Sequence, residues 1–370
     1  MRFPEFSGEW ENSRLGFIAE FSKGSGISKD QRSETGNPCI LYGELYTRYK
    51  SEVIKNVISK TDLPDTELVK SKANDIIIPA SGETAEDIAT ARCVPYDNIL
   101  LGGDLNIIRL KNQDGRFFSY QLNGVRKYDI ATVAQGVSVV HLHAGDLKGI
   151  SVKYPSNMAE QRKIAEMISI IDDRIETQSK IIEEQETLLK SLADILFRQN
   201  NHLCPLSELV DIIKGKQLNA DNLSEEGDFY VMNGGITPSG YYSEYNVSAG
   251  AISISEGGNS CGYVQFNEEP FWSGGHCYSL RSKNTIVDYK YIYYFLKAKQ
   301  TDVMALRIGS GLPNIQKKDI EKFTISFPSV QLQKQIVKAL DALSEKINTE
   351  KQFLEKYCQQ KNYLLSKLFI

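Results

Sequence analysis

Residues 164–196 read IAEMISIIDDRIETQSKIIEEQETLLKSLADIL, and residues 336–368 read IVKALDALSEKINTEKQFLEKYCQQKNYLLSKL. In both stretches mostly apolar positions recur in alternating steps of 4 and 3, and a constant offset of 172 residues relates the two series. This spacing is typical of the seam of a coiled-coil helix. We therefore predict two long helices paired through Ile164, Ile168, Ile171, Ile175, Ile182, Leu189, Leu192, Ile336, Leu340, Leu343, Ile347, Leu354 and Leu364.

The charges of the two helices favour their pairing with each other. Segment 157–199 has a net charge of −3, and segment 330–370 has a net charge of +3. Opposite charges on helices of equal length favour a mixed pair. We expect an antiparallel arrangement with one globular domain at each end. The alternative is a homodimer in which each helix pairs with its own copy.

The repeat continues outside the helices. At an offset of 191 residues, Lys23-Gly24 matches Lys214-Gly215, and at an offset of 173 Pro155 matches Pro328. A duplicated unit of this kind determines the whole fold. We predict a first domain over residues 1–156, a first helix over 157–199, a second domain over 200–329 and a second helix over 330–370.

Both predicted domains are rich in β-structure. Short apolar runs between glycine, proline and asparagine clusters are typical of strands, and an aromatic run of ten residues indicates a buried helix. The sequence thus predicts an α+β fold with an internal pseudo-twofold repeat. The strands include 75–79, 105–110, 250–255 and 323–327, the helix covers 289–298, and Asp114-Gly115 and Asn123-Gly124 are expected turns.

Several classes of protein are not indicated. The chain has no apolar run of 18 residues and no charged-then-apolar leader, so we expect a soluble, cytoplasmic protein. Its six cysteines form no CxxC pair, and it lacks the glycine patterns of nucleotide-binding loops. His141 and His143 have no evident third partner for a metal. We expect no catalytic site, no metal site and no cofactor bound by this chain.

Polar and aromatic residues in the loops of both repeats are candidates for binding. Lysine and arginine hold phosphates, glycine allows close backbone approach, and asparagine can read adenine edges. Taken singly, each matches an ordinary surface turn, but the set recurs in both domains. A net charge of −4 also suggests that a partner supplies basic surface if the target is DNA. The candidates are Lys23, Ser25, Tyr46, Arg48, Lys214, Lys216, Asn233, Tyr241, Tyr242, Ser310 and Asn314.

The organisation of the chain resembles that of the DNA-specificity subunits of type I restriction–modification systems. The resemblance lies in two variable domains, each followed by a long helix that opens at Pro155-Ser156 or Pro328-Ser329 and continues through Gln161 or Gln335. The opening segment 2–10, RFPEFSGEW, is also similar. The second helix departs from the family by having Gln333-Lys334 where a Glu-Gln pair is usual.

The resemblance implies a function. Each domain would be a target recognition domain that reads one half of an asymmetric, split site in double-stranded DNA. The helices would set the spacer between the halves and dock two adenine methyltransferase subunits, and restriction subunits would join them. S-adenosylmethionine, ATP and Mg would be bound by those partners, and this chain would be non-catalytic. The alternative is a non-enzymatic coiled-coil scaffold with two ligand-binding β domains.

Overall fold

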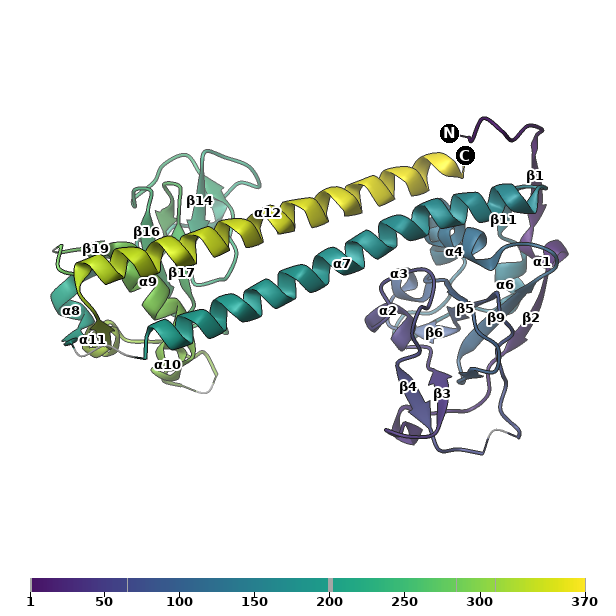
Figure 1. Ribbon diagram of the computed structural model, residues 1–370, viewed down its shortest axis with the longest axis horizontal. Coiled ribbons are helices and arrows are strands. Elements are labelled where there is room, and N and C mark those ends of the chain that lie inside the picture. The colour runs from purple at the N-terminus through teal and green to yellow at the C-terminus, as the bar shows by residue number, and fades with distance from the viewer. Residues whose placement is uncertain (1, 65, 199–201, 284, 310, 370) are drawn as a thin grey trace. The chain divides into compact units, whose positions relative to one another are not determined.

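A computed structural model describes residues 2–64, 66–198, 202–283, 285–309 and 311–369 (Figure 1). The chain divides into two compact units, residues 1–179 with 352–370 and residues 180–351. Each unit therefore contains one β-rich body and a segment of each long helix, α7 (Met158–Leu196) and α12 (Val330–Leu368). None of the helices described is long and apolar enough to span a bilayer.

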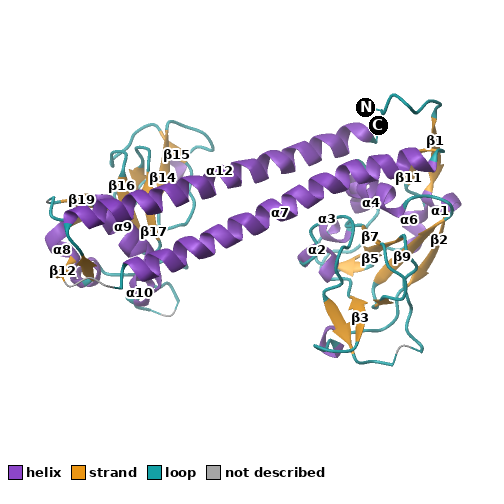
Figure 2. Cartoon of the chain, in the orientation of Figure 1, coloured by secondary structure: helices purple, strands orange, loops and turns teal. Residues whose placement is uncertain are grey.

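The first unit is built on an antiparallel four-stranded sheet in the order β2-β9-β5-β7. A three-stranded sheet, β4-β3-β8, and two strand pairs, β1-β11 and β10-β6, complete it (Figure 2). Its strands are β1 (Trp10–Arg14), β2 (Ala19–Lys23), β3 (Asn37–Ile40), β4 (Ser59–Thr61), β5 (Asp75–Pro79), β6 (Ser81–Gly82), β7 (Arg92–Val94), β8 (Leu100–Leu101), β9 (Leu105–Leu110), β10 (Val140–His141) and β11 (Ser151–Pro155). Its shorter helices are α1 (Leu15–Ile18), α2 (Glu44–Thr47), α3 (Ala85–Ile88), α4 (Gly115–Asn123), α5 (Lys127–Thr132) and α6 (Ala144–Lys148).

The second unit repeats this topology. Its four-stranded sheet has the order β13-β19-β16-β17, its three-stranded sheet β15-β14-β18, and its strand pair β12-β20. In both three-stranded sheets one pairing is parallel, β3 with β8 and β14 with β18. Its strands are β12 (His202–Pro205), β13 (Val210–Lys214), β14 (Phe229–Met232), β15 (Tyr241–Tyr242), β16 (Ala251–Ser255), β17 (Val264–Asn267), β18 (Trp272–Ser273), β19 (Cys277–Ser282) and β20 (Thr324–Phe327). Its shorter helices are α8 (Leu206–Leu209), α9 (Tyr289–Ala298), α10 (Gln300–Ala305) and α11 (Lys317–Lys322).

The predicted α+β class is confirmed, and α9 covers the predicted helix. The expected turn at Asp114-Gly115 is wrong, because these residues begin helix α4, whereas Asn123-Gly124 ends that helix and leads into a turn over residues 124–126. The Asp114 carboxylate accepts hydrogen bonds from the backbone N–H groups of Arg116 and Phe117, which makes it the N-cap. Glycine after the last helical residue is equally typical of a helix end. Turn and cap residues are the same residue types, so the sequence did not separate the two cases.

Apolar residues of both long helices contribute to the core of each unit. In the first unit, Ile164, Ile168 and Ile171 of α7 lie in one buried cluster with Leu364 and Phe369 of the chain end. In the second unit, Ala193 of α7 lies in a cluster with Ile336 and Leu340 of α12, and Leu189 and Leu192 pack against it. Ile182 and Ile347 are also buried, whereas Ile175, Leu343 and Leu354 are half-buried. Within each unit the two helix segments thus run in opposite directions.

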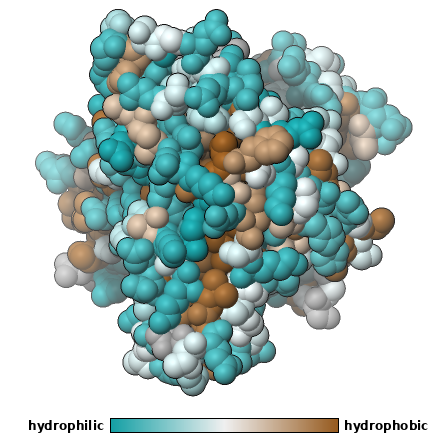
Figure 3. Space-filling model, turned by 90° about the vertical axis from the view of Figure 1, so that its right-hand side faces the viewer, coloured by the Kyte–Doolittle hydropathy of each residue, from teal (hydrophilic) through white to brown (hydrophobic). Residues whose placement is uncertain are grey.

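The surface carries isolated apolar side chains among polar ones. In the first unit Phe17 is 79% exposed, Tyr128 78% and Val137 98%. Figure 3 shows one face of the molecule, where hydrophilic residues surround a narrow apolar strip. Single exposed apolar side chains such as these three are normal for folded proteins. Val137 lies in the loop that leads to β10.

A partly buried lysine makes the stability of the second unit depend on pH. Burial lowers the pKa of Lys297 from 10.5 to about 8. Between those values the unfolded chain binds more protons than the folded chain, so stability gained from this residue rises with pH. We expect the melting temperature of the wild type to increase relative to that of Lys297→Met as the pH rises from about 8 to about 10.5. A pH-independent difference between the two proteins over this range would contradict the prediction.

Candidate nucleic-acid interface

Three of the predicted binding residues of the second unit converge. The ammonium of Lys214, at the end of β13, lies 2.7 Å from Glu256 Oε1. The Asn233 side-chain oxygen accepts a hydrogen bond from the backbone N–H of His276 at 3.2 Å. Asn314 forms an isolated β-bridge with Gly257, next to Glu256. The sequence predicted Lys214, Asn233 and Asn314 as binding residues. It did not predict Glu256 and His276, which lie next to them.

Glu256 organises this cluster. Its Oε1 also accepts a hydrogen bond from the Tyr278 hydroxyl at 2.8 Å. Burial, together with this carboxylate, raises the pKa of Tyr278, which keeps the phenol protonated as a donor. Glu256 Oε2 is buried without a hydrogen-bond partner among the described residues, and His276 Nδ1 lies 3.7 Å from it. The imidazole itself is 62% exposed, so one edge of it faces the carboxylate and the rest faces solvent.

Lys216, Tyr241 and Tyr242 form a second group. The indole N–H of Trp272 donates to the backbone carbonyl of Lys216 at 3.0 Å, and the Trp272 ring meets Tyr242 edge-on at 5.1 Å. Tyr241 and Tyr242 make up β15, paired with β14. In the part of the chain that the structure describes, the Lys216 ammonium makes no ion pair, so its charge is available to a phosphate.

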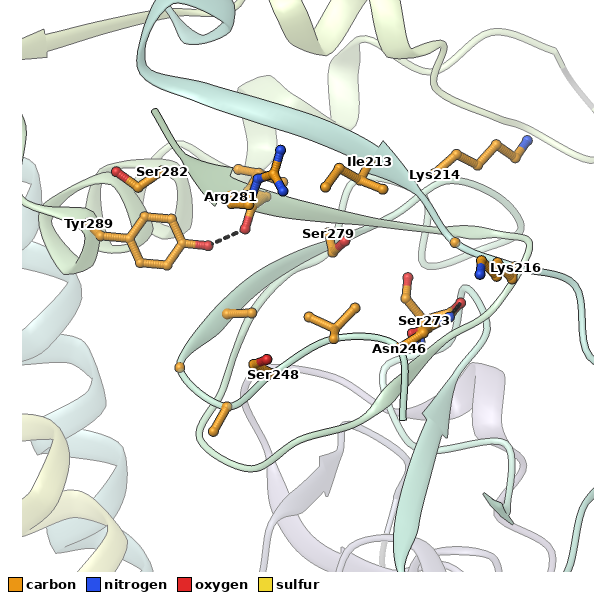
Figure 4. Close-up of a pocket in the computed structure, with 16 residues that line it drawn as sticks. Ile213, Lys214, Lys216, Asn246, Ser248, Ser273, Ser279, Arg281, Ser282 and Tyr289 are labelled. Carbon is orange, nitrogen blue, oxygen red and sulfur yellow. Dashed lines mark hydrogen bonds between the residues drawn. The ribbon is translucent and has the colours of Figure 1, made fainter. Parts of the chain in front are cut away.

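A pocket of about 470 Å³ opens between β13, β19 and residues 246–251 (Figure 4). Lys216, Asn246 and Ser273 lie together at one end, and Ser282 and Tyr289 at the other. The Asn246 side chain exchanges two hydrogen bonds with the Ser273 backbone, of 3.0 and 2.6 Å, which fix this wall. Hydroxyl, amide and cationic groups are the donors that protein–DNA interfaces use toward phosphate and sugar. The end of the pocket beside Lys216 can therefore bind an anionic group.

In the first unit the predicted residues are more dispersed. Lys23 ends β2, opposite Asn106 of β9. Ser25 Oγ accepts a hydrogen bond from the Val69 N–H at 2.8 Å. Arg48 Nη1 donates to Glu44 Oε1 at 3.1 Å. Burial raises the pKa of Tyr46. Ser25 and Arg48 thus have partners within the unit.

Ser310 lies outside the described residues. The rings of His141 and His143 stack with centroids 6.4 Å apart, and no group of three potential metal ligands occurs among the residues described. His141 belongs to β10, which closes the loop that contains Val137 through paired backbone hydrogen bonds with Gln135 of 2.9 and 2.7 Å. In the second unit Ile308 and Asn314 close the matching loop in the same way, at 2.8 and 3.0 Å.

Both units contain a feature that we call the glycine clasp, in which a Lys-Gly loop closes on a Gly-Gly turn. A Cβ atom on Gly24 would lie 1.9 Å from the carbonyl oxygen of Gly102, and one on Gly215 would lie 2.1 Å from that of Gly274. Only glycine permits this approach. Three backbone hydrogen bonds hold the clasp in each unit. In the first unit they run from Gly24 N to Leu105 O (3.0 Å), from Ser25 N to Leu101 O (3.0 Å) and from Ala80 N to Asp104 O (2.7 Å). In the second unit the matching bonds run from Gly215 N to Cys277 O (2.8 Å), from Lys216 N to Ser273 O (2.8 Å) and from Glu256 N to His276 O (2.9 Å).

The fold and these sites define a class of duplicated α+β proteins, in which one domain fold occurs twice with different surface residues. Residues 7–187 and 201–356 match the family described as the type I restriction modification DNA specificity domain. The chain belongs to this family.

Relatives and solved structures agree with the family match. A putative type I specificity subunit of Mycoplasma genitalium is 27% identical over 281 residues, covering 72% of this chain and 73% of that protein. One of Mycoplasma pneumoniae is 24% identical over 327 residues, covering 79% and 86%. The crystal structure of a type I restriction–modification S subunit from M. genitalium matches with a TM-score of 0.72 at 23% identity, covering 100% of this chain and 99% of that one. A chain from a structural study of type I R-M complex assembly matches with a TM-score of 0.59 at 16% identity, covering 99% and 98%. At these identities the two structures establish a shared fold.

Proposed function

We propose that this chain is the DNA-recognition subunit of a type I restriction–modification complex, and that each β-rich domain reads one half of an asymmetric split site. The observation that carries the proposal is the family match over both halves of the chain, together with two domains that share one frame but not their surface residues. A shared frame supports the same task in both domains, and different residues support different half-sites. Family membership does not favour the scaffold alternative.

The proposal assigns a part to each segment. Residues 1–156 and 200–329 recognise DNA, and the helices of 157–199 and 330–370 set the spacer and dock two adenine methyltransferase subunits. The related structure from a study of R-M complex assembly supports such partners. The chain carries no catalytic residues in this proposal. S-adenosylmethionine, ATP and Mg act in the methyltransferase and restriction subunits of a cytoplasmic complex.

The charge of the chain supports dependence on those partners. The net charge is −4, and in the second unit Lys214 and Arg281 are paired with Glu256 and Asp211. Phosphate contacts supply most of the non-specific affinity for DNA. We therefore expect the isolated chain to bind DNA weakly and the methyltransferase complex to bind it tightly.

The proposal is tested by sequencing modified bases in DNA from cells that express this chain with its methyltransferase partner. We expect methyladenine in a split, asymmetric motif that disappears when this chain is deleted, because only this chain would select the site. The control is the same methyltransferase with another specificity subunit, which shows that the enzyme is active. A palindromic motif, or an active methyltransferase whose motif does not depend on this chain, would contradict the proposal.

A further inference from the structure

In each glycine clasp the Gly-Gly pair is followed by one residue that we call the tip residue, and the two units have different tip residues. The turn before β9 reads Gly102-Gly103-Asp104, and the turn before β19 reads Gly274-Gly275-His276, at an offset of 172 residues. Both tips are exposed. The backbone carbonyl of each tip residue is tied to the first residue after the neighbouring strand, at 2.7 Å in the first unit and 2.9 Å in the second. The backbone at the tip is thus fixed in the same way twice, while its side chain changes.

An exposed side chain on a fixed backbone is better placed to contact a ligand than to stabilise the domain by packing. A residue kept for packing would be buried, but these side chains project from a clasp that needs only glycine and backbone hydrogen bonds. Rigid backbone is also what recognition demands, since base contacts require side chains held at defined positions. Each tip residue lies beside the Lys-Gly loop of its own unit, whose lysine is exposed at the end of the strand. In the first unit Lys23 can bind a phosphate while the tip reaches a base edge, whereas in the second unit Lys214 is paired with Glu256.

We propose that Asp104 and His276 are base-reading residues, one in each domain, and that they help to make the two half-sites different. This inference rests on the proposed function and specifies its chemistry. A carboxylate only accepts hydrogen bonds, so in the major groove Asp104 selects a base with an exocyclic amino group, cytosine or adenine. His276 offers a single acceptor, its outer ring nitrogen Nε2, where Asp104 offers a carboxylate with two oxygens, and it likewise selects a base with an exocyclic amino group.

Glu256 acts as a positioning residue for His276. Its Oε2 lies 3.7 Å from Nδ1, and its Oε1 is held by Lys214 and Tyr278 at 2.7 and 2.8 Å. A carboxylate that faces Nδ1 favours the tautomer with its proton on Nδ1, which leaves Nε2 on the outer side of the ring as an acceptor. In the first unit the residue that matches Glu256 in the sheet register is Ala80. Among the described residues no carboxylate takes this place beside Asp104, so its position is set by the backbone.

One substitution distinguishes a purely conformational role of Asp104 from a role in reading a base. Its φ is +56°, a left-handed conformation that asparagine and aspartate adopt more easily than other residues apart from glycine. Asp104→Asn preserves this preference but replaces one acceptor oxygen with a donor NH₂ group. A turn residue tolerates this exchange without a change in the recognised sequence. A base-reading residue does not.

The test uses the complex of this chain with its methyltransferase and measures methylation rates on duplexes randomised at each position of the wild-type motif. We expect Asp104→Asn to change the preference at one base pair of one half-site about tenfold, equivalent to about 1.4 kcal/mol. His276→Gln should do the same at one base pair of the other half-site, and Glu256→Gln should weaken that second preference only. Each change should leave the opposite half-site unaltered.

Glu20→Gln and His202→Gln are the matched controls. Glu20 is exposed at the other end of strand β2, and His202 is exposed on β12 of the second unit. Both should retain the wild-type preference at every position. Unchanged preferences in Asp104→Asn and His276→Gln would overturn the inference, and so would a uniform loss of rate on all sequences, which indicates a phosphate contact. Because the wild-type complex must first show its split motif, failure of the proposed function is detected separately.

Discussion

Replacing Lys361 with methionine is expected to lower the free energy of unfolding by about 3–5 kcal/mol, the range typical of removing one partner from a buried ion pair. The Lys361 ammonium lies 2.5 Å from Glu52 and 2.7 Å from Asp172, and the three side chains are only 12%, 9% and 3% exposed. Burial opposes the charge, but the two carboxylates outweigh it and hold the pKa of Lys361 above its ordinary value. Methionine would leave two buried carboxylates without their ion-pair partner.

Urea denaturation followed by circular dichroism measures this loss. Lys351→Met is the matched control, since the ion pair of Lys351 with Glu186 has side chains 52% and 50% exposed and should contribute less than about 1 kcal/mol. Adding Glu52→Gln to Lys361→Met should recover part of the stability by removing one unpaired charge. Equal losses in the two lysine variants would show that the buried cluster is not a stabilising contact of the first unit.

The long helices were predictable because their pattern is local. Steps of 3 and 4 residues need only the sequence of one helix, and the repeat at 172 residues supplied a second instance. Position 361 belongs to the same series, at the place where the first helix has Leu189. The sequence shows that a lysine occupies an apolar position, but not why. Its partners come from residues 52 and 172, which the fold brings together over a long separation in the chain.

The binding residues were less accessible to prediction. Lys214, Asn233 and Asn314 were recognised by residue type, but Glu256 lies at the end of a buried strand and reads as part of it. Arg48 was recognised for its charge, whereas the fold directs it to Glu44. The glycine clasp did leave a signal. Gly-Gly occurs at the same place in both repeats, followed by Asp104 in one and His276 in the other. An alignment of the two halves at an offset of 172 would have found it.

The second large effect is expected for Gly24→Ala, which should lower the free energy of unfolding of the first unit by about 1–3 kcal/mol, as overpacking does elsewhere. The new Cβ atom would lie 1.9 Å from the carbonyl oxygen of Gly102, and backbone on both sides leaves it no flexible neighbour to displace. The loop must therefore separate from the turn, and the hydrogen bond from Gly24 N to Leu105 O would be lost or lengthened. Thermal and urea denaturation measure the stability.

Gly26→Ala is the control, because a Cβ atom on Gly26 meets nothing within 4 Å and the position is only two residues away. It should change stability by less than about 0.5 kcal/mol. If the clasp positions the base-reading tip, Gly24→Ala should also weaken selection of the first half-site in the methyltransferase complex, whereas Gly215→Ala should weaken selection of the second. Loss of stability with selection intact in both half-sites would mean that the clasp supports the fold alone. Equal behaviour of Gly24→Ala and Gly26→Ala would mean that the close approach of the two backbones does not constrain the domain.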